Sequence, residues 1–191
     1  MKKRISITFN APAVLTFVMI CFVVTVVGIL THQASTTLLF TTYRASFLDP
    51  LTYLRFFTHV FGHAGWSHFL GNMSYLLLLG PMLEEKHGSK LLVIAMVITA
   101  FVTGLINFIF FPGVALCGAS GIVFAFIVLA SFTGFKRGEI PLTFILVLVI
   151  YIGQQVVDGL FTKDNISQMA HIVGGLVGAV VGYLANLKTG K

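Results

Sequence analysis

The sequence predicts an all-α polytopic membrane protein with six transmembrane helices, and three observations lead to this fold class. Of its 191 residues, 57% are hydrophobic and only 9% are charged, whereas a soluble domain carries roughly 25% charged residues. Six apolar segments follow one another, each close to the roughly 20 residues that a helix needs to cross a membrane. The net charge is +6, but no basic cluster is interleaved with aromatic residues, which disfavours nucleic-acid binding.

The six segments form one expected membrane domain over residues 1–191, with a tail at 1–12, a six-helix core at 13–187 and a tail at 188–191. The predicted spans are Ala13–Leu30, Ser67–Leu83, Ser89–Phe111, Ala119–Phe135, Ile140–Val157 and Gln168–Leu187. The first apolar run is longer than the 7 to 15 residues of a signal peptide and no Ala-x-Ala site follows it, so we expect a retained anchor.

The basic residues predict the orientation, because 11 of the 12 lie outside the predicted spans and Lys90 lies at the inner end of the third. If the N-terminus is inside, three of them face outward: Arg44, Arg55 and Lys163. The other nine are cytoplasmic: Lys2, Lys3, Arg4, Lys86, Lys90, Lys136, Arg137, Lys188 and Lys191. This asymmetry predicts that both termini are cytoplasmic. Since no transit peptide is visible, we expect a multi-pass protein of the bacterial plasma membrane.

The longest connection, residues 31–66, is expected to be a structured outer loop partly embedded in the membrane. It carries Pro50, several aromatic residues and few charges, which is unlike a free linker. The two cysteines, Cys21 and Cys117, lie in apolar segments and are interpreted as small buried side chains rather than a disulfide.

Polar residues inside the spans identify the candidate site, since a polar side chain in lipid is costly. All six acidic residues fall in loops or at span ends, which excludes an intramembrane aspartyl protease, and no H-E-x-x-H zinc motif occurs. The polar residues that remain are His68, Asn72, Asn107, Ser120 and His171.

Four of these residues are predicted to lie at similar depth. The second, fourth and sixth spans run in the same direction, so depth can be counted at 1.5 Å per residue from their inner ends. Ser120 lies about 22 Å and His171 about 24 Å above those ends. His68 lies about 22 Å and Asn72 about 16 Å above the inner end of the second span.

This layer favours serine peptidase chemistry. Ser120 is the candidate nucleophile and His171 the candidate general base. His68, Asn72 and the backbone N–H of Ser120 are candidate oxyanion donors. No acid lies at this depth, so the predicted arrangement is a Ser-His dyad.

Other interpretations of the same residues remain open. Gly118 and Gly121 around Ser120 are also typical of helix packing, and a histidine at a span end is often interfacial. His59 and His63 have the i, i+4 spacing of metal ligands, but no cysteine or carboxylate completes a set nearby, so we expect no metal and no cofactor.

Taken together, these motifs resemble the rhomboid family of intramembrane serine proteases over about residues 53–183. The matching motifs, in family order, are His68 and Asn72 in H-x-x-x-N, Glu84 and Gly88 in E-x-x-x-G, Gly118 to Gly121 in G-x-S-G, and Ala170 to Gly178 in A-H-x-x-G-x-x-x-G. The resemblance implies that transmembrane segments of membrane proteins are the substrates and that the bilayer surrounds the site.

The resemblance also assigns roles to residues around the dyad. It implies that Arg55 stabilises the outer loop, although Leu54 stands where the family usually has tryptophan. Phe124 occupies a position where bacterial members often carry tyrosine, and it is expected to stack on His171.

Two further expectations concern whole spans. The fifth span, with Gln154, Gln155 and Asp158, is the candidate gate, and a small-residue ridge lets the sixth span approach the fourth: Gly174, Gly178 and Gly182.

Two other functions compete with the protease. The first is a catalytically inactive rhomboid-like protein that binds membrane clients, although inactive relatives usually lose the serine or the histidine, and both are present here. The second is a small transporter, which the absence of carboxylates within the spans disfavours.

Overall fold

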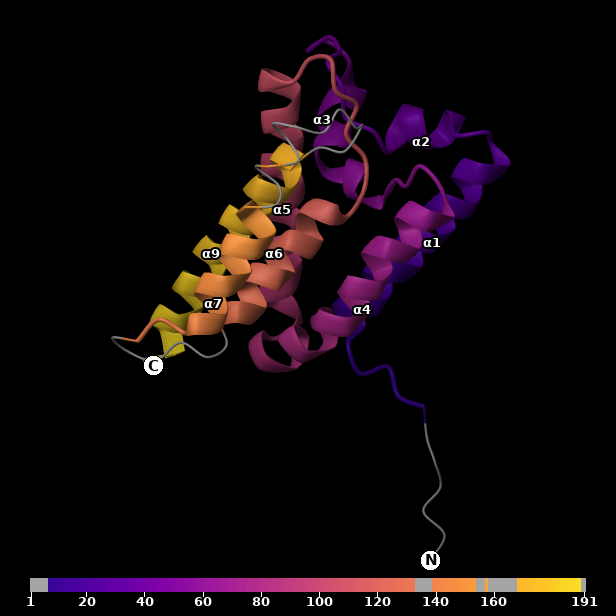
Figure 1. The fold of residues 1–191 in the computed structure, drawn as a ribbon. Helices are drawn as coiled ribbons and strands as arrows, with labels where there is room; N and C mark the ends of the chain where they lie inside the picture. Colours follow the sequence, from indigo (N-terminus) through magenta and orange to yellow (C-terminus); the bar gives the residue numbers. More distant parts are fainter. Residues whose placement is uncertain (1–6, 133–138, 154–156, 158–167, 190–191) are drawn as a thin grey trace, which may run out of the picture.

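The structure is a computed structural model that describes residues 7–132, 139–153, 157 and 168–189. Every named element in these ranges is helical, as the sequence predicts (Figure 1). The long helices are α1 (Pro12–Leu30), α4 (Trp66–His87), α5 (Ser89–Phe110), α6 (Ser120–Ser131) and α9 (Gln168–Thr189). The shorter ones are α2 (Ala34–Leu39), α3 (Pro50–Thr58), the 3-10 turn η1 (His59–Phe61), α7 (Leu142–Val147) and the π-helical turn η3 (Leu148–Ile152).

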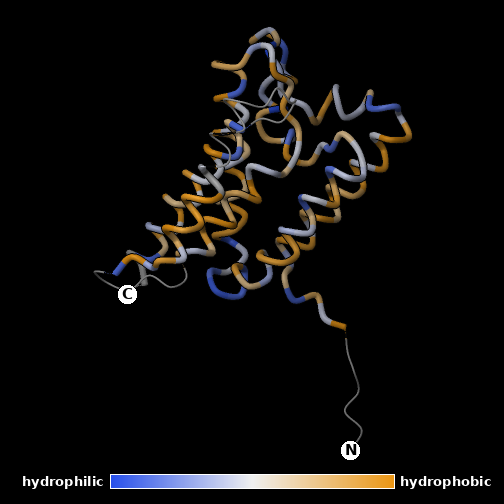
Figure 2. Tube along the Cα trace, viewed as in Figure 1, coloured by the Kyte–Doolittle hydropathy of each residue, from blue (hydrophilic) through white to orange (hydrophobic). Residues whose placement is uncertain are grey.

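Three of the described helices are long and apolar enough to cross a membrane: Pro12–Leu30, Ser89–Phe110 and Gln168–Asn186. They coincide with the first, third and sixth predicted spans. The α6 helix is a shorter apolar helix that begins at Ser120, as expected for a fourth span that starts late. The second predicted span lies within α4, and the described part of the fifth consists of α7 and η3. Figure 2 shows the apolar character along most of the helices and the polar turn between α4 and α5.

Local chemistry explains where the helices begin and end. Pro12 opens α1, where its missing N–H costs nothing. Pro50 opens α3, and the Asp49 side chain caps that helix by accepting a hydrogen bond from the amide of Leu51 at 2.9 Å. Gly88 has a φ of +80° and makes the tight turn between α4 and α5.

A carboxylate joins the start of α1 to the end of α4. One oxygen of Glu84 accepts hydrogen bonds from the amide of Ala13 at 2.8 Å and the hydroxyl of Ser89 at 2.6 Å, and the other accepts from the amide of Val14 at 3.0 Å. These bonds satisfy amides that the first turn of a helix leaves free. Burial by itself raises the pKa of Glu84, but the three hydrogen bonds outweigh it and lower the pKa below its ordinary value.

The bundle is arranged so that α6 lies in its interior. Most of the α6 side chains are buried, and they pack with α1, α4 and α5 in one apolar core. In Figure 1 α9 lies beside α6, while α1 and α4 lie on the other side. The outer loop with α2 and α3 covers the end of the bundle opposite the N-terminus. Cys21 is buried and Cys117 is half-buried, and the thiols of both are free.

Candidate active site

Ser120 is the first residue of α6, and the loop that leads into it is in contact with the second predicted span. Gly118 has a φ of +121°, and a Cβ atom built there would lie 2.6 Å from the Nε2 and Cε1 atoms of His68. The same point is 3.5 Å from Nδ2 of Asn72. The structure therefore brings His68 and Asn72 against the backbone two residues before Ser120. Nδ2 of Asn72 is buried without a hydrogen-bond partner, so a donor is held ready beside this loop.

His171 lies in the first turns of α9 and faces the beginning of α6. Its ring stacks on Phe124, with centroids 4.4 Å apart and an angle of 6° between the planes. Phe124 is one helical turn after Ser120, so the expected stack is present. At the same level, a Cβ on Gly121 would lie 3.3 Å from the carbonyl oxygen of Ala170. The first turn of α6 and the turn of α9 that bears His171 are thus in direct contact.

The glycine ridge of α9 is the reason for this close approach. A Cβ on Gly174 would overlap the backbone of Gly121, and one on Gly178 would overlap the backbone of Ala125. A Cβ on Gly182 would lie 2.8 Å from the ring of Phe132. Without side chains at these positions, the two helices pack backbone to backbone, as small residues allow in membrane helices.

The loop that precedes Ser120 is tied to its surroundings by backbone hydrogen bonds. The amide of Gly118 donates to the carbonyl oxygen of His59 at 2.9 Å. Thr42 and Leu116 form an antiparallel bridge with two bonds of 2.9 Å. Asn107 donates from Nδ2 to the carbonyl oxygen of Val114 at 2.9 Å. Its polarity inside a span made Asn107 conspicuous in the sequence, and the structure gives it a part in holding this loop.

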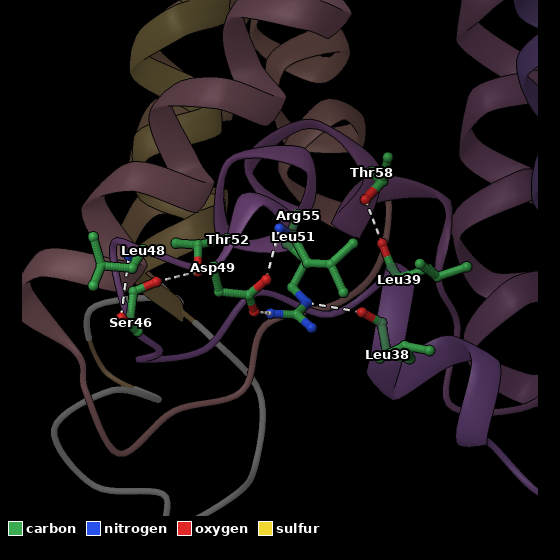
Figure 3. A network of polar contacts seen from close by, with 9 residues as sticks. All are labelled: Leu38, Leu39, Ser46, Leu48, Asp49, Leu51, Thr52, Arg55 and Thr58. Atoms are coloured by element: carbon green, nitrogen blue, oxygen red, sulfur yellow. Dashed lines mark hydrogen bonds and ion pairs between the residues drawn. The ribbon is translucent and has the colours of Figure 1, made fainter.

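Arg55 organises the outer loop on which those bonds depend (Figure 3). Its side chain is only 3% exposed, and Nε donates to the carbonyl oxygen of Leu38 at 2.8 Å. Nη1 donates to Asp49 at 3.3 Å, and the guanidinium lies 4.7 Å from the centre of the Tyr43 ring. Leu54, the residue before Arg55, is 44% exposed.

Two of the three histidines in the outer loop bind backbone oxygens. Nε2 of His59 is 3.0 Å from the carbonyl oxygen of Ala100, and Nδ1 of His63 is 3.1 Å from that of Phe61. Within the part of the chain that the structure describes, no group of three His, Cys, Asp or Glu side chains is placed to hold a metal ion. The predicted gate residues Gln154, Gln155 and Asp158 lie outside the described residues.

The fold and this arrangement define a class: a helical membrane protein in which a serine opens a buried helix beside histidine and asparagine side chains. Residues 50–187 match the family model of the rhomboid domain, and the chain belongs to the rhomboid family.

The chain is similar in sequence to several rhomboid proteins. Rhomboid-related protein 1 of Caenorhabditis elegans is 33% identical over 68% of this chain, and rhomboid-like protein 11, chloroplastic, of Arabidopsis thaliana is 25% identical over 68%. Rhomboid protease GlpG of Haemophilus influenzae is 28% identical over 68%. The chain spans 39% of the worm protein, 51% of the plant protein and 68% of the Haemophilus protein.

Proposed function

We propose that this chain is an intramembrane serine endopeptidase that uses Ser120 as nucleophile and His171 as general base. The observation that carries the proposal is the glycine contact between α6 and α9, because it holds the ring of His171 stacked on Phe124, and Phe124 lies one helical turn after Ser120. Membership of a family that contains rhomboid proteases supports it. The orphan amide of Asn72 and the adjacent ring of His68 supply groups of the kind that an oxyanion needs.

The proposed reaction proceeds in two halves. His171 takes the hydroxyl proton of Ser120 as the serine oxygen bonds to the peptide carbonyl carbon, and the carbonyl electrons move to its oxygen. His68, Asn72 and the N–H of Ser120 stabilise that oxyanion. The protonated His171 then gives its proton to the leaving amine as the peptide bond breaks. In the second half, water attacks the acyl-serine, His171 accepts a water proton, and that proton returns to Ser120 as the product acid leaves.

The proposed setting is the bacterial plasma membrane, with six spans and both termini cytoplasmic. The basic-residue asymmetry supports this topology. The proposed substrates are transmembrane segments of membrane proteins. Because a transmembrane helix hides its carbonyls in backbone hydrogen bonds, a segment with Gly, Ala or Pro near the scissile bond should be cleaved faster than one with Leu at those positions.

The test is covalent labelling of the purified protein in detergent with a fluorophosphonate, together with cleavage of a reference transmembrane substrate. Wild type should label and cleave, and both Ser120→Ala and His171→Ala should do neither. Ser131→Ala is the matched control, because Ser131 lies at the other end of α6 and donates its hydroxyl to the carbonyl of Ile127 at 3.0 Å. It should retain both activities.

Labelling that persists in Ser120→Ala would refute the assignment of the nucleophile. A wild type that neither labels nor cleaves would refute the protease and leave the client-binding protein as the explanation of the fold.

A further inference from the structure

A groove on the lipid-facing side of the bundle lies away from the candidate active site. It runs between α1 and α5, is closed at one end by α3 and η1, and has a volume of about 430 Å³. Its floor consists of buried side chains, among them Phe17, Val60 and Met96. Its rim is exposed: Ile20 is 42% and Val97 is 48% exposed. The groove is therefore open to the surroundings of the protein along its length.

The apolar lining of the groove favours a hydrocarbon ligand. Its polar lining residues are Thr16 and Ser89, and the Ser89 hydroxyl is already bonded to Glu84. Ordered water needs two to four polar partners, which such a lining does not offer. An empty groove would forfeit dispersion contacts along both helices. Both α1 and α5 are apolar enough to span a membrane, so the medium at the rim is lipid hydrocarbon.

The length of the groove matches one acyl chain. Its lining residues on α5 run from Ser89 to Ala100, which is about 16 Å of helix. One leaflet contributes about half of a hydrocarbon core of roughly 30 Å. A chain that entered beside Ser89 would therefore end beneath η1, near the middle of the bilayer.

The Ser89 end of the groove is also suited to a phosphate. Lys90, the next residue, is exposed on the first turn of α5. The acidic Glu84 nearby is buried and accepts three hydrogen bonds within the protein.

We propose that one phospholipid binds at this site, with an acyl chain in the groove between α1 and α5 and its phosphate beside Lys90. The closed end of the groove gives the lipid a structural role. Val60 and Phe61 belong to η1, and the preceding residue, His59, binds the amide of Gly118 at 2.9 Å. The acyl chain thus supports the segment that holds the loop before Ser120. Binding does not depend on the proposed protease activity.

Native mass spectrometry of the protein purified in a mild detergent tests the proposal, with two neighbouring substitutions on α5. Val97 lines the groove and is 48% exposed, whereas Ile98 does not line it and is 41% exposed. Wild type and Ile98→Trp should each retain one phospholipid mass. Val97→Trp should lower the retained fraction at least about tenfold, as expected when roughly two methylene groups lose their burial.

Equal retention by Val97→Trp and Ile98→Trp would overturn the site, and so would an adduct with the mass of a free fatty acid or of detergent alone. If Val97→Trp does not fold, Ala100→Leu narrows the same groove from its floor and carries the same expectation. Phosphatidylglycerol added back to delipidated protein should bind more weakly to Lys90→Glu than to wild type, and equal binding would contradict the placement of the phosphate. Ser120→Ala should retain the lipid, which separates this result from any failure of the protease.

Discussion

Two regions hold the candidate site together by opposite means. The interface of α6 and α9 consists of glycines against backbone, with Gly174 on Gly121 and Gly178 on Ala125. The outer loop, residues 31–66, is held instead by polar side chains bonded to backbone carbonyls, with Arg55 at its centre. The difference reflects the backbone. A helix satisfies its own hydrogen bonds and needs only close packing, whereas an irregular loop near lipid needs partners for every polar group.

The glycine interface should be the more sensitive of the two regions. Gly178→Leu is expected to abolish substrate cleavage, because a side chain there would collide with the backbone of Ala125 and push His171 away from Ser120. Membrane insertion should be unchanged, since the substitution adds an apolar residue. Cleavage of a reference substrate and membrane fractionation are the measurements.

A graded series checks this explanation. Gly178→Ala should cost more activity than Gly182→Ala, because the obstacle at Gly182 is the ring of Phe132, which can move. Gly71→Ala is the control, since nothing lies within 4 Å of a Cβ at that position. Full cleavage by Gly178→Leu, or equal losses across the series, would contradict a backbone contact as the cause.

A substitution in the outer loop should lower the stability of the folded protein, and a loss of activity should follow from that. Arg55→Ala removes the donors for Leu38 and Asp49 and leaves the part-buried carbonyl of Leu38 without this partner, which should lower the free energy of unfolding by about 2 kcal/mol. Arg55→Lys should recover only part of the loss, because an ammonium lacks the planar fork. Unfolding in mixed detergent micelles measures both. A variant as stable as wild type would show that the network in Figure 3 is dispensable.

The hydrogen bonds of Glu84 show that a polar side chain can also hold two helices of the bundle together. Glu84→Gln should lower the free energy of unfolding by about 1.5 kcal/mol at neutral pH, since the amides of Ala13 and Val14 lose a charged acceptor. The pKa of Glu84 is lowered in the folded protein, so its stabilisation is complete above the ordinary carboxyl range and disappears as the pH falls through the folded value. The gap between wild type and variant should therefore close in acid. A gap that is independent of pH would contradict the role of the charge.

The stack on His171 should give the smallest effect. Phe124→Tyr keeps the ring that lies 4.4 Å from the imidazole and should change kcat by no more than about threefold, whereas Phe124→Ala should lower it about tenfold. Steady-state cleavage kinetics separate the two variants. Equal kcat values for Phe124→Ala and wild type would show that the stack does not position the base.

The sequence predicted the apolar helices well because their signal is local. The predicted first, third and sixth spans agree with α1, α5 and α9 within about two residues at each end, and α6 begins one residue after its predicted start. The fourth and sixth spans were also expected to meet along the glycine ridge, and they do. The fifth span proved less regular, since its described part changes from α7 to the π-helical turn η3.

Contacts between distant segments were beyond the reach of the sequence. The bridge between Thr42 and Leu116 joins residues more than 70 positions apart, and no periodicity marks either partner. The hydrogen bond from the Gly118 amide to the His59 carbonyl could not be predicted either. Every residue carries a backbone carbonyl, so the sequence does not mark which one accepts this bond. Arg55 was identified from the family motif, but its burial against Tyr43 and Leu38 required coordinates. The roles of Ser120 and His171 remain proposals that the labelling experiment decides.

Two glycines in the loop before Ser120 illustrate how unevenly that loop is constrained. Gly118 combines a left-handed backbone with the ring of His68 at the place where a Cβ would stand, so any other amino acid there would be strained and would displace that ring. Gly113, five residues earlier, has nothing within 4 Å of its missing Cβ. In a library of random codons, the first position should return glycine alone and the second a broad mixture. The constraint on the sequence of this loop is thus concentrated at single positions rather than spread along the loop.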